Sequence, residues 1–313
     1  MKLVFAGSPK VALPSLEALA QVHEVLAVVT RPPARGRRGP GLVPTEVGAW
    51  AQDRGVPVLA PESLRDPGFV DAIHQLAPDA CCVVAYGGLI TRELLAVPRH
   101  GWVNLHFSLL PAYRGAAPVQ HALLDGCTRT GLTTFSLVPA LDAGPVFRQL
   151  TVDIDPYETS GDLLDRLATL GAGAMLDTVA DLALGVLPVA QPAEGVSLAP
   201  KLTPDQGRLD VGGPAAQFVN KVRAFSPDPG AWLQLCSQRF PPERFRVLRA
   251  VPASSQPQPA AREPGTLVAT KNRLYLAVHN DWVDLVEVQA GGKKRMAGAD
   301  WARGGLKEGD RLE

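Results

Sequence analysis

Residues 104–111 read Asn-Leu-His-Phe-Ser-Leu-Leu-Pro, so an asparagine and a histidine stand two positions apart at the end of an apolar run. In an extended strand, side chains two positions apart lie on the same face, and we expect the Asn104 carboxamide and the His106 imidazole to point the same way. Such a pair can donate hydrogen bonds to an oxygen that gains negative charge during a reaction. A lone histidine is more often a hydrogen-bonded structural residue, and this stretch by itself leaves both interpretations open.

The first half of the chain alternates apolar segments with segments of helical periodicity. Strands are predicted over residues 2–7, 24–30, 79–86, 102–108 and 131–138. A long amphipathic helix is predicted within 159–185, with Thr159 or Ser160 as its cap. Buried strands separated by helices favour an α/β fold, an open and mostly parallel sheet with helices on both faces. In that architecture the chemistry lies at the carboxyl ends of the strands, where Asn104 and His106 are expected.

The second half changes character after a stretch rich in proline, alanine and glycine. Residues 187–203 have no clear periodicity and are predicted to be a linker between a domain over 1–186 and a domain over 204–313. The second domain has a predicted helix over 214–225, followed by short strands separated by turn signals, which favours a small β-barrel. A length of 313 residues agrees with two domains, since it exceeds what one core usually holds.

The composition excludes several classes of protein. No apolar run approaches the roughly 20 residues of a membrane helix, and the N-terminal MKLVFAG does not resemble a signal peptide, so we predict a cytoplasmic protein without a membrane partner. The four cysteines have no metal-ligand spacing; we expect reduced thiols and no metal. Net charge is zero, but residues 1–203 hold 15 Lys and Arg against 19 Asp and Glu, and the remainder 16 against 12. This asymmetry weakly favours a polyanion that meets the second part.

Two motifs in order carry a family resemblance. NLHFSLLPAYRGAAPVQ (104–120) followed by LDAGPV (141–146) resembles the formyltetrahydrofolate-dependent formyltransferases. The segments FAGSP, VVAYG, KLTPDQGRLD and RAFSPDPGAW extend the resemblance over the whole chain and are similar to the members that formylate methionine on initiator tRNA. The resemblance implies a Rossmann-like formyltransferase domain, an OB-like β-barrel that binds tRNA, 10-formyltetrahydrofolate as cosubstrate and initiator methionyl-tRNA as acceptor. We further predict a monomer.

The resemblance implies Asn104, His106 and Asp142 as catalytic residues. Attack of an amine on the formyl carbon places negative charge on oxygen, which Asn104 and His106 can stabilise as donors. Asp142 either holds His106 in one tautomer or relays a proton, and the sequence does not decide between these roles. Without the resemblance, Asp142 would be interpreted as a turn residue. No covalent intermediate is needed, and Ser108 lacks the G-x-S-x-G context of a serine nucleophile.

Two further segments are expected to bind the folate. The resemblance assigns this contact to the Ser-Leu-Leu-Pro turn, and the glycines after the strand at 79–86 would let backbone approach the flat pteridine, although a plain turn explains them about as well. The predicted cofactor-binding residues are Ser108, Leu109, Leu110, Pro111, Tyr86 and Gly87. FAGSPK lacks the glycine patterns of dinucleotide and ATP sites, so NAD and ATP are excluded.

A basic loop is the predicted RNA contact. RPPARGRRGPG (31–41) holds several arginines among Pro and Gly, which in isolation would be interpreted as a solvated loop. In the family a basic loop at this place meets the tRNA acceptor end. The predicted tRNA-binding residues are Arg35, Arg37, Arg38, Lys293 and Lys294, with Lys221 and Arg223 as further candidates. The alternatives are a formyltransferase acting on a small amine such as an amino sugar nucleotide, a hydrolase of the same folate, and a non-catalytic RNA-binding module.

Overall fold

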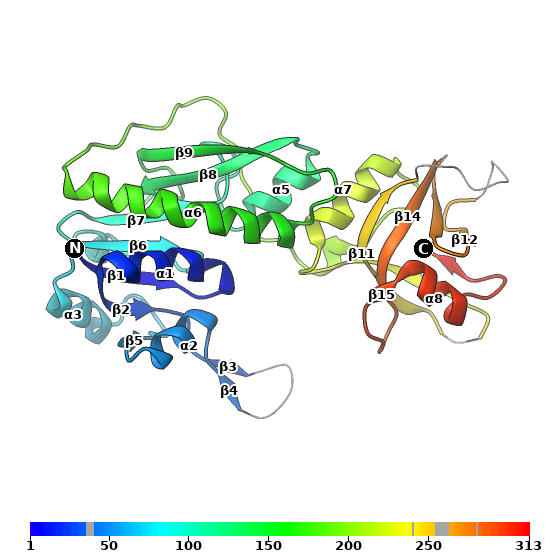
Figure 1. The fold of residues 1–313 in the computed structure, drawn as a ribbon, viewed down its shortest axis with the longest axis horizontal. Helices are drawn as coiled ribbons and strands as arrows, with labels where there is room; N and C mark the ends of the chain where they lie inside the picture. Colours follow the sequence, from blue (N-terminus) through cyan, green and yellow to red (C-terminus); the bar gives the residue numbers. More distant parts are fainter. Residues whose placement is uncertain (36–40, 240, 254–262, 280) are drawn as a thin grey trace. The chain divides into compact units, whose positions relative to one another are not determined.

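The computed structural model describes residues 1–35, 41–239, 241–253, 263–279 and 281–313 (Figure 1). The described chain forms two compact units. Unit 1 comprises Met1–Pro118, Arg129–Asp153 and Leu164–Pro200, and unit 2 comprises Val119–Thr128, Ile154–Leu163 and Lys201–Glu313. The boundaries predicted at residues 186 and 204 stay a prediction. None of the helices in the described residues is long and apolar enough to cross a membrane.

Unit 1 is built on a sheet with the strand order β5-β2-β1-β6-β7-β8-β9. Its strands are β1 (Lys2–Gly7), β2 (Glu24–Val29), β5 (Val58–Leu59), β6 (Ala80–Val84), β7 (Trp102–His106), β8 (Arg129–Ser136) and β9 (Val146–Asp153). The first five strands in this order, β5, β2, β1, β6 and β7, pair in parallel. Strand β8 pairs antiparallel with both β7 and β9. The mostly parallel sheet was predicted. β9 was missed because most of its side chains are exposed and no apolar run marks it.

Helices cover both faces of this sheet. They are α1 (Leu13–Val22), α2 (Glu46–Asp53), α3 (Pro67–Leu76), α4 (Arg92–Leu95), most of α6 (Ser160–Ala183) and the 3-10 helix η1 (Lys10–Ala12). On one face, Phe69 of α3 and Leu94 of α4 share a buried cluster with Trp102 of β7. On the other face, α6 packs so closely that a Cβ on Gly171 would lie 2.5 Å from a methyl group of Leu105. The predicted fold class is therefore confirmed for unit 1.

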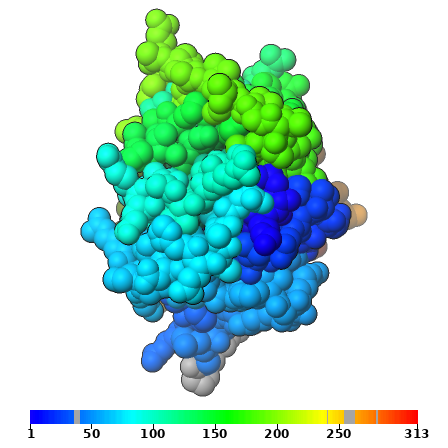
Figure 2. Space-filling view, turned by 90° about the vertical axis from the view of Figure 1, so that its left-hand side faces the viewer, coloured from blue at the N-terminus to red at the C-terminus, as the bar shows by residue number. Residues whose placement is uncertain are grey.

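The start of α6 is held by a pair of reciprocal hydrogen bonds. At its start, the Thr159 hydroxyl accepts a hydrogen bond from the Asp162 backbone N–H, and the Asp162 carboxylate accepts one from the Thr159 N–H. This reciprocal cap satisfies two backbone donors and confirms Thr159 as the cap. After α6, the chain lies at the surface of unit 1, where residues near 190 form the yellow-green protrusion at the top of Figure 2. A short hairpin of β3 (Ala34–Arg35) and β4 (Leu42–Val43) also belongs to unit 1.

Unit 2 contains an antiparallel sheet that closes on itself. Its strands are β10 (Ala231–Cys236), β11 (Glu243–Pro252), β12 (Leu267–Ala269), β13 (Leu274–Val278), β14 (Asp281–Gln289), β15 (Met296–Ala297) and β16 (Arg311–Leu312), in the order β12-β13-β14-β11-β10-β16 with β15 on β14. Closure comes from a bridge between Thr266 and Arg311, next to a Leu312 N–H that donates to the Gly265 carbonyl at 3.0 Å. The predicted small barrel is confirmed. The remaining helices are α5 (Pro118–Leu124), η2 (Asp205–Gly207), α7 (Ala215–Phe225) and α8 (Gly298–Gly305).

Candidate active site

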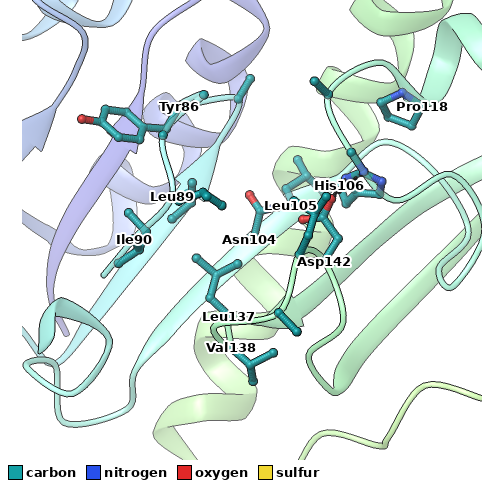
Figure 3. Close-up of a pocket in the computed structure, with 18 of the residues that line it drawn as sticks. Tyr86, Leu89, Ile90, Asn104, Leu105, His106, Pro118, Leu137, Val138 and Asp142 are labelled. Carbon is teal, nitrogen blue, oxygen red and sulfur yellow. Dashed lines mark hydrogen bonds and ion pairs between the residues drawn. The ribbon is translucent and has the colours of Figure 1, made fainter. Parts of the chain in front are cut away.

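A cavity of about 420 Å³ opens in unit 1 beside the ends of β6 and β7. It is bordered by residues 85–90 after β6, by the end of β7, by residues 115–118 and by the loop 137–142 after β8. Its walls are mostly apolar, while Asn104, His106 and Asp142 contribute polar side chains (Figure 3). The structure thus brings the three predicted catalytic residues, from two separate segments, to one cavity.

The His106 imidazole is buried and its two nitrogens have different neighbours. Nε2 lies 2.8 Å from the Tyr113 carbonyl oxygen, and since a carbonyl only accepts, Nε2 carries the proton. Nδ1 faces the Asp142 carboxylate at 3.8 Å, beyond direct hydrogen-bond range. Burial lowers the pKa of His106 below its ordinary value of 6.5, an effect that the Asp142 charge and the Tyr113 carbonyl partly oppose. The ring is therefore neutral near pH 7, with a free lone pair on Nδ1.

The Asp142 carboxylate is held by the loop opposite it. Its Oδ2 accepts a hydrogen bond of 2.7 Å from the Gly115 backbone N–H. Asp142 has a φ of 45°, in the left-handed region that aspartate and asparagine tolerate better than most residues. Gly115 has a φ of 127°, and a Cβ there would lie 2.6 Å from the Ala199 carbonyl oxygen, so only glycine fits this position. Gly115, the glycine of the Arg-Gly pair in the motif, therefore positions the Asp142 carboxylate through its backbone N–H.

Asn104 presents a side chain that is available to a ligand. It lies two residues before His106 on β7, is half-buried and lines the same cavity. Within the described part of the chain, no protein group forms a hydrogen bond with its carboxamide. Figure 3 shows this group pointing into the space between Leu89 and Asp142. The amide N–H₂ is thus placed to donate to an oxygen in the cavity.

Gln191 and Ser197 lie in the segment predicted as a linker, and neither was predicted as part of a site. The Gln191 amide donates to the carbonyl oxygens of Asp142 and Gly144, both at 2.8 Å, and its own oxygen accepts from Arg114 at 2.6 Å. The Ser197 hydroxyl accepts from the Tyr113 N–H at 2.8 Å. Through these bonds, residues 191–197 connect the loop that holds Tyr113 and Arg114 to the loop that holds Asp142. A segment without periodicity carries no local signal for such contacts.

Replacing Gln191 with alanine is expected to lower kcat about 10- to 100-fold, because the Asp142 loop loses two hydrogen bonds and small displacements of catalytic groups are costly. The KM for the folate is expected to change less. Steady-state kinetics check this, with Gln52→Ala, an exposed glutamine on α2, as the control. Gln191→Glu is not expected to restore kcat, because a carboxylate cannot donate to the two carbonyls. Full activity of Gln191→Ala would remove this positioning role.

The Ser-Leu-Leu-Pro turn does not line the cavity. Ser108 is fully buried and its hydroxyl donates to the Ala112 carbonyl at 2.6 Å, so it is not poised as a nucleophile. Thr133 accepts from the Leu110 N–H at 3.1 Å and donates to the Ser108 carbonyl at 2.7 Å. Gln149 donates to the Leu110 carbonyl at 2.6 Å. The structure thus places Ser108, Leu109, Leu110 and Pro111 as a braced support behind His106.

Tyr86 and Gly87, in contrast, lie in the cavity wall. Tyr86 is buried, and burial raises the pKa of its phenol while the charge of Arg31 opposes the rise. Gly87 has a φ of 76° and open space where a Cβ would be, so it is the backbone conformation that favours glycine there. The neighbouring Gly88 has a steric reason, because its Cβ would lie 2.8 Å from the Tyr86 ring.

The basic residues have different surroundings. Arg35 is exposed at the end of β3, while Arg37 and Arg38 lie outside the described residues. Lys293 and Lys294 are exposed in the turn after β14. The expectation that Arg223 contacts phosphate is wrong: its side chain is buried, and its guanidinium donates to the Glu158 and Asp155 carbonyls, both at 2.8 Å.

No cluster of three or more His, Cys, Asp or Glu side chains suited to a metal ion occurs among the described residues. The site is instead an apolar cavity with a neutral histidine, a carboxamide and a carboxylate. This combination suits transfer of a small electrophilic group to an amine, with proton transfer at the histidine and charge stabilisation at the amide.

Comparison with known proteins defines the class. A family model described as formyl transferase matches residues 1–179, and a second model, described as formyl transferase, C-terminal domain, matches residues 201–306. The chain therefore belongs to the formyl transferase family, as the two motifs predicted. It is 50% identical to a methionyl-tRNA formyltransferase of Thermobifida fusca, over 100% of this chain and 99% of that protein. A methionyl-tRNA formyltransferase of Streptomyces coelicolor is 49% identical over the same shares.

Solved structures share the fold at much lower identity. An N-formyltransferase from Helicobacter canadensis, in complex with folinic acid and dTDP-3-aminofucose, has a TM-score of 0.65 at 14% identity, covering 93% of this chain and 99% of its own. HypX from Aquifex aeolicus, in complex with tetrahydrofolic acid, has a TM-score of 0.65 at 14% identity, covering 96% of this chain and 46% of its own. At these identities the likeness supports the fold alone.

Proposed function

We propose that the chain transfers the formyl group of 10-formyltetrahydrofolate to the α-amine of methionine esterified to initiator tRNA. The observation that carries this proposal is the 50% identity to a methionyl-tRNA formyltransferase over the full length, including the barrel of unit 2. A small-amine acceptor such as an amino sugar nucleotide is the second candidate. The Helicobacter canadensis enzyme supports it only through a shared fold at 14% identity.

The cavity suits the folate by size and lining. Ligand sites usually have volumes of about 300 to 1,000 Å³, apolar walls and a few convergent polar groups. Tyr86 and Gly87 in the wall after β6 are assigned to the folate ring system. Ser108 to Pro111 are assigned a supporting role, because their side chains and backbone brace the end of β7.

Each catalytic side chain has a role that its surroundings support. Asn104 donates to the formyl oxygen as negative charge develops there. His106 takes a proton from the attacking amine at Nδ1, and passes it to the departing folate nitrogen. Asp142, 3.8 Å away, stabilises the imidazolium that exists between these two steps. The Tyr113 carbonyl keeps the proton of His106 on Nε2 by accepting a hydrogen bond from it. Holding the tautomer was one of the two roles that the sequence analysis had considered for Asp142.

The direct test is a transfer assay. The full chain is incubated with 10-formyltetrahydrofolate labelled in the formyl group, methionyl initiator tRNA, and a panel of small amines that includes an amino sugar nucleotide. Label is expected on methionyl-tRNA, with little on the small amines. Transfer to a small amine without transfer to tRNA would overturn the proposal in favour of the second candidate. Release of free formate alone would indicate a hydrolase.

The RNA contact is proposed for Arg35, Arg37 and Arg38 of the basic loop and for Lys293 and Lys294 of the barrel. Arg38→Ala is expected to weaken tRNA binding and to reduce the slope of log Kd against log salt by about 0.7 to 1 unit, because one phosphate contact is lost. Filter binding at several salt concentrations checks this. Arg99→Ala, an exposed arginine before β7, is the control. An unchanged slope in Arg38→Ala would move the contact to another residue, with Arg37 the next to test.

The cellular setting follows from the proposed reaction. Charged initiator tRNA is used by ribosomes, so a cytoplasmic location is proposed. We also propose that the chain acts as a monomer. Fractionation of cells and light scattering of the purified chain test these two points.

A further inference from the structure

Three hydroxyl side chains of unit 1 meet around the two ends of the segment 31–44, which contains the basic loop and the strands β3 and β4. Thr30 comes directly before this segment, Thr45 directly after it, and Ser8 follows β1. The Thr30 hydroxyl donates to the Ser8 hydroxyl at 3.4 Å and shares a second hydrogen bond with the Thr45 hydroxyl. One buried side chain thus connects both ends of the segment to each other and to the end of β1.

Backbone hydrogen bonds support the same connection. The Arg31 N–H, at the first residue of the segment, donates to the Ser8 hydroxyl at 3.1 Å. The Gly48 N–H, in the first turn of α2, donates to the Thr45 hydroxyl at 3.0 Å. The start of the segment and the helix that follows it are therefore bonded to the same hydroxyl cluster.

The hydroxyl cluster lies beside the active-site cavity. Gly7, the last residue of β1, pairs with Val84 at the end of β6, and the chain that follows β6 lines the cavity. Ser8 is therefore one strand away from the cavity wall. Arg31 is close enough to Tyr86 in that wall for its charge to oppose the rise in the phenol pKa. Figure 1 shows the β3–β4 hairpin extending from unit 1 next to α2.

Burial alone does not explain why residue 30 is a threonine. Its side chain is 2% exposed and follows Val28 and Val29 of β2, so a valine of the same shape would suit the position. Burying a hydroxyl is costly unless it is hydrogen-bonded. Thr45 caps α2 with its own oxygen, so the helix does not need the Thr30 hydroxyl. The connection between the two ends of the segment is what this hydroxyl provides.

We propose that Ser8, Thr30 and Thr45 anchor the basic loop beside the cavity and orient it towards the acceptor end of the tRNA, with Thr30 as a positioning residue. This inference rests on the proposed function. Joining the two ends of a loop reduces the conformational entropy that is left to lose when the loop binds a partner. The arginines contact the phosphates in this arrangement, and the hydroxyls do not. Loss of the anchor is therefore expected to weaken RNA binding without changing the number of phosphates contacted.

The central test compares Thr30→Val and Thr30→Ser in the full chain. Valine keeps the shape but removes the hydroxyl, and it is expected to raise the Kd for methionyl initiator tRNA about three- to tenfold, the effect of one hydrogen bond. The slope of log Kd against log salt is expected to stay at its wild-type value, in contrast to Arg38→Ala. Serine keeps the hydroxyl and is expected to restore most of the affinity. A wild-type Kd or a reduced slope in Thr30→Val, or equal losses in the two variants, would overturn the proposal.

Thr178→Val is the matched control, because the Thr178 hydroxyl bonds with the Thr134 hydroxyl at 2.7 Å in another buried part of unit 1. It is expected to keep the wild-type affinity for tRNA. The KM for the folate is expected to change less than about twofold in Thr30→Val, and an increase equal to that for tRNA would overturn the proposal. If Thr30→Val does not fold, Ser8→Ala, at a half-buried position, is measured in the same way with the same expected results.

Hydrogen exchange of the free chain separates the anchor from the proposed function. Without RNA, the backbone amides of β3 and β4 are expected to exchange faster in Thr30→Val than in the wild type or in Thr178→Val. Unchanged exchange would overturn the anchor even if the chain transfers formyl groups to tRNA. Faster exchange in a chain that formylates only a small amine would overturn the proposed function rather than the anchor.

Discussion

Replacing His106 with alanine is expected to lower kcat for formyl transfer by about 10²- to 10⁴-fold, the range for loss of a general base or a charge-stabilising group. The imidazole is buried, its Nε2–H is occupied by the Tyr113 carbonyl, and its Nδ1 is the nitrogen free to accept a proton. No other imidazole lines the cavity among the described residues, so no substitute base is available there. Single-turnover kinetics with methionyl-tRNA measure the effect on the chemical step.

The control must separate catalysis from folding, because His106 also packs edge-on against Phe135, with ring centroids 6.4 Å apart. His106→Gln keeps a polar side chain that can still donate to the Tyr113 carbonyl. It is expected to keep the thermal stability of the wild type while remaining as slow as the alanine variant. A folded His106→Gln protein with a nearly normal rate would remove the proton-transfer role.

The second large effect is expected for Asp142→Asn. Asparagine tolerates the left-handed backbone at this position and its oxygen can still accept from the Gly115 N–H, so the loop is expected to keep its shape. What is lost is a negative charge 3.8 Å from Nδ1 of His106. Such a charge stabilises an imidazolium by roughly 1 to 4 kcal/mol, or about 5- to 10³-fold in rate. The KM for folate is expected to change much less than kcat.

The pH dependence provides an independent check on Asp142. Burial lowers the His106 pKa below 6.5 and the Asp142 charge partly opposes this, so removing the charge is expected to lower the pKa further. A general base works when it is unprotonated, and the acid limb of the rate profile is therefore expected to move to lower pH in Asp142→Asn. The α-amine of the substrate titrates identically with both enzymes, so the comparison isolates the histidine. A limb that stays in place would contradict the coupling.

Stability is linked to the same titration. A histidine whose folded pKa lies below its unfolded value binds its proton less readily in the folded state, so the free energy of unfolding is expected to fall as the pH drops through 6.5 towards the folded pKa. Urea unfolding of the wild type and of His106→Gln, at pH 7.5 and at about pH 5.5, measures this contribution as the difference between the two proteins. No difference between them would mean that the burial of His106 has no net protonation cost.

The sequence by itself determined the features that depend on neighbours along the chain. Period-two alternation predicted that Asn104 and His106 share a face of β7, and apolar runs predicted β1, β2 and β6, because pleat and burial leave a local pattern. A helix cap at Thr159 or Ser160 also followed from the local sequence, and the hydrogen bonds in the structure assign it to Thr159. The two motifs predicted the family, and the short strands of the second half predicted a barrel.

The tertiary structure alone decided which distant residues meet. Gln191 reaches the Asp142 loop because the chain after α6 returns along the site. Ser8, Thr30 and Thr45 likewise meet from three separate segments. The sequence suggested that Arg223 is an exposed cation. Its side chain is instead buried, and its guanidinium donates to the backbone carbonyls of residues 155 and 158. Such contacts depend on strand order and loop paths, which no local period of the sequence encodes. The face of β7 on which His106 lies was therefore predictable. The Tyr113 carbonyl that binds its ring and the Gln191 side chain that holds the Asp142 loop were not.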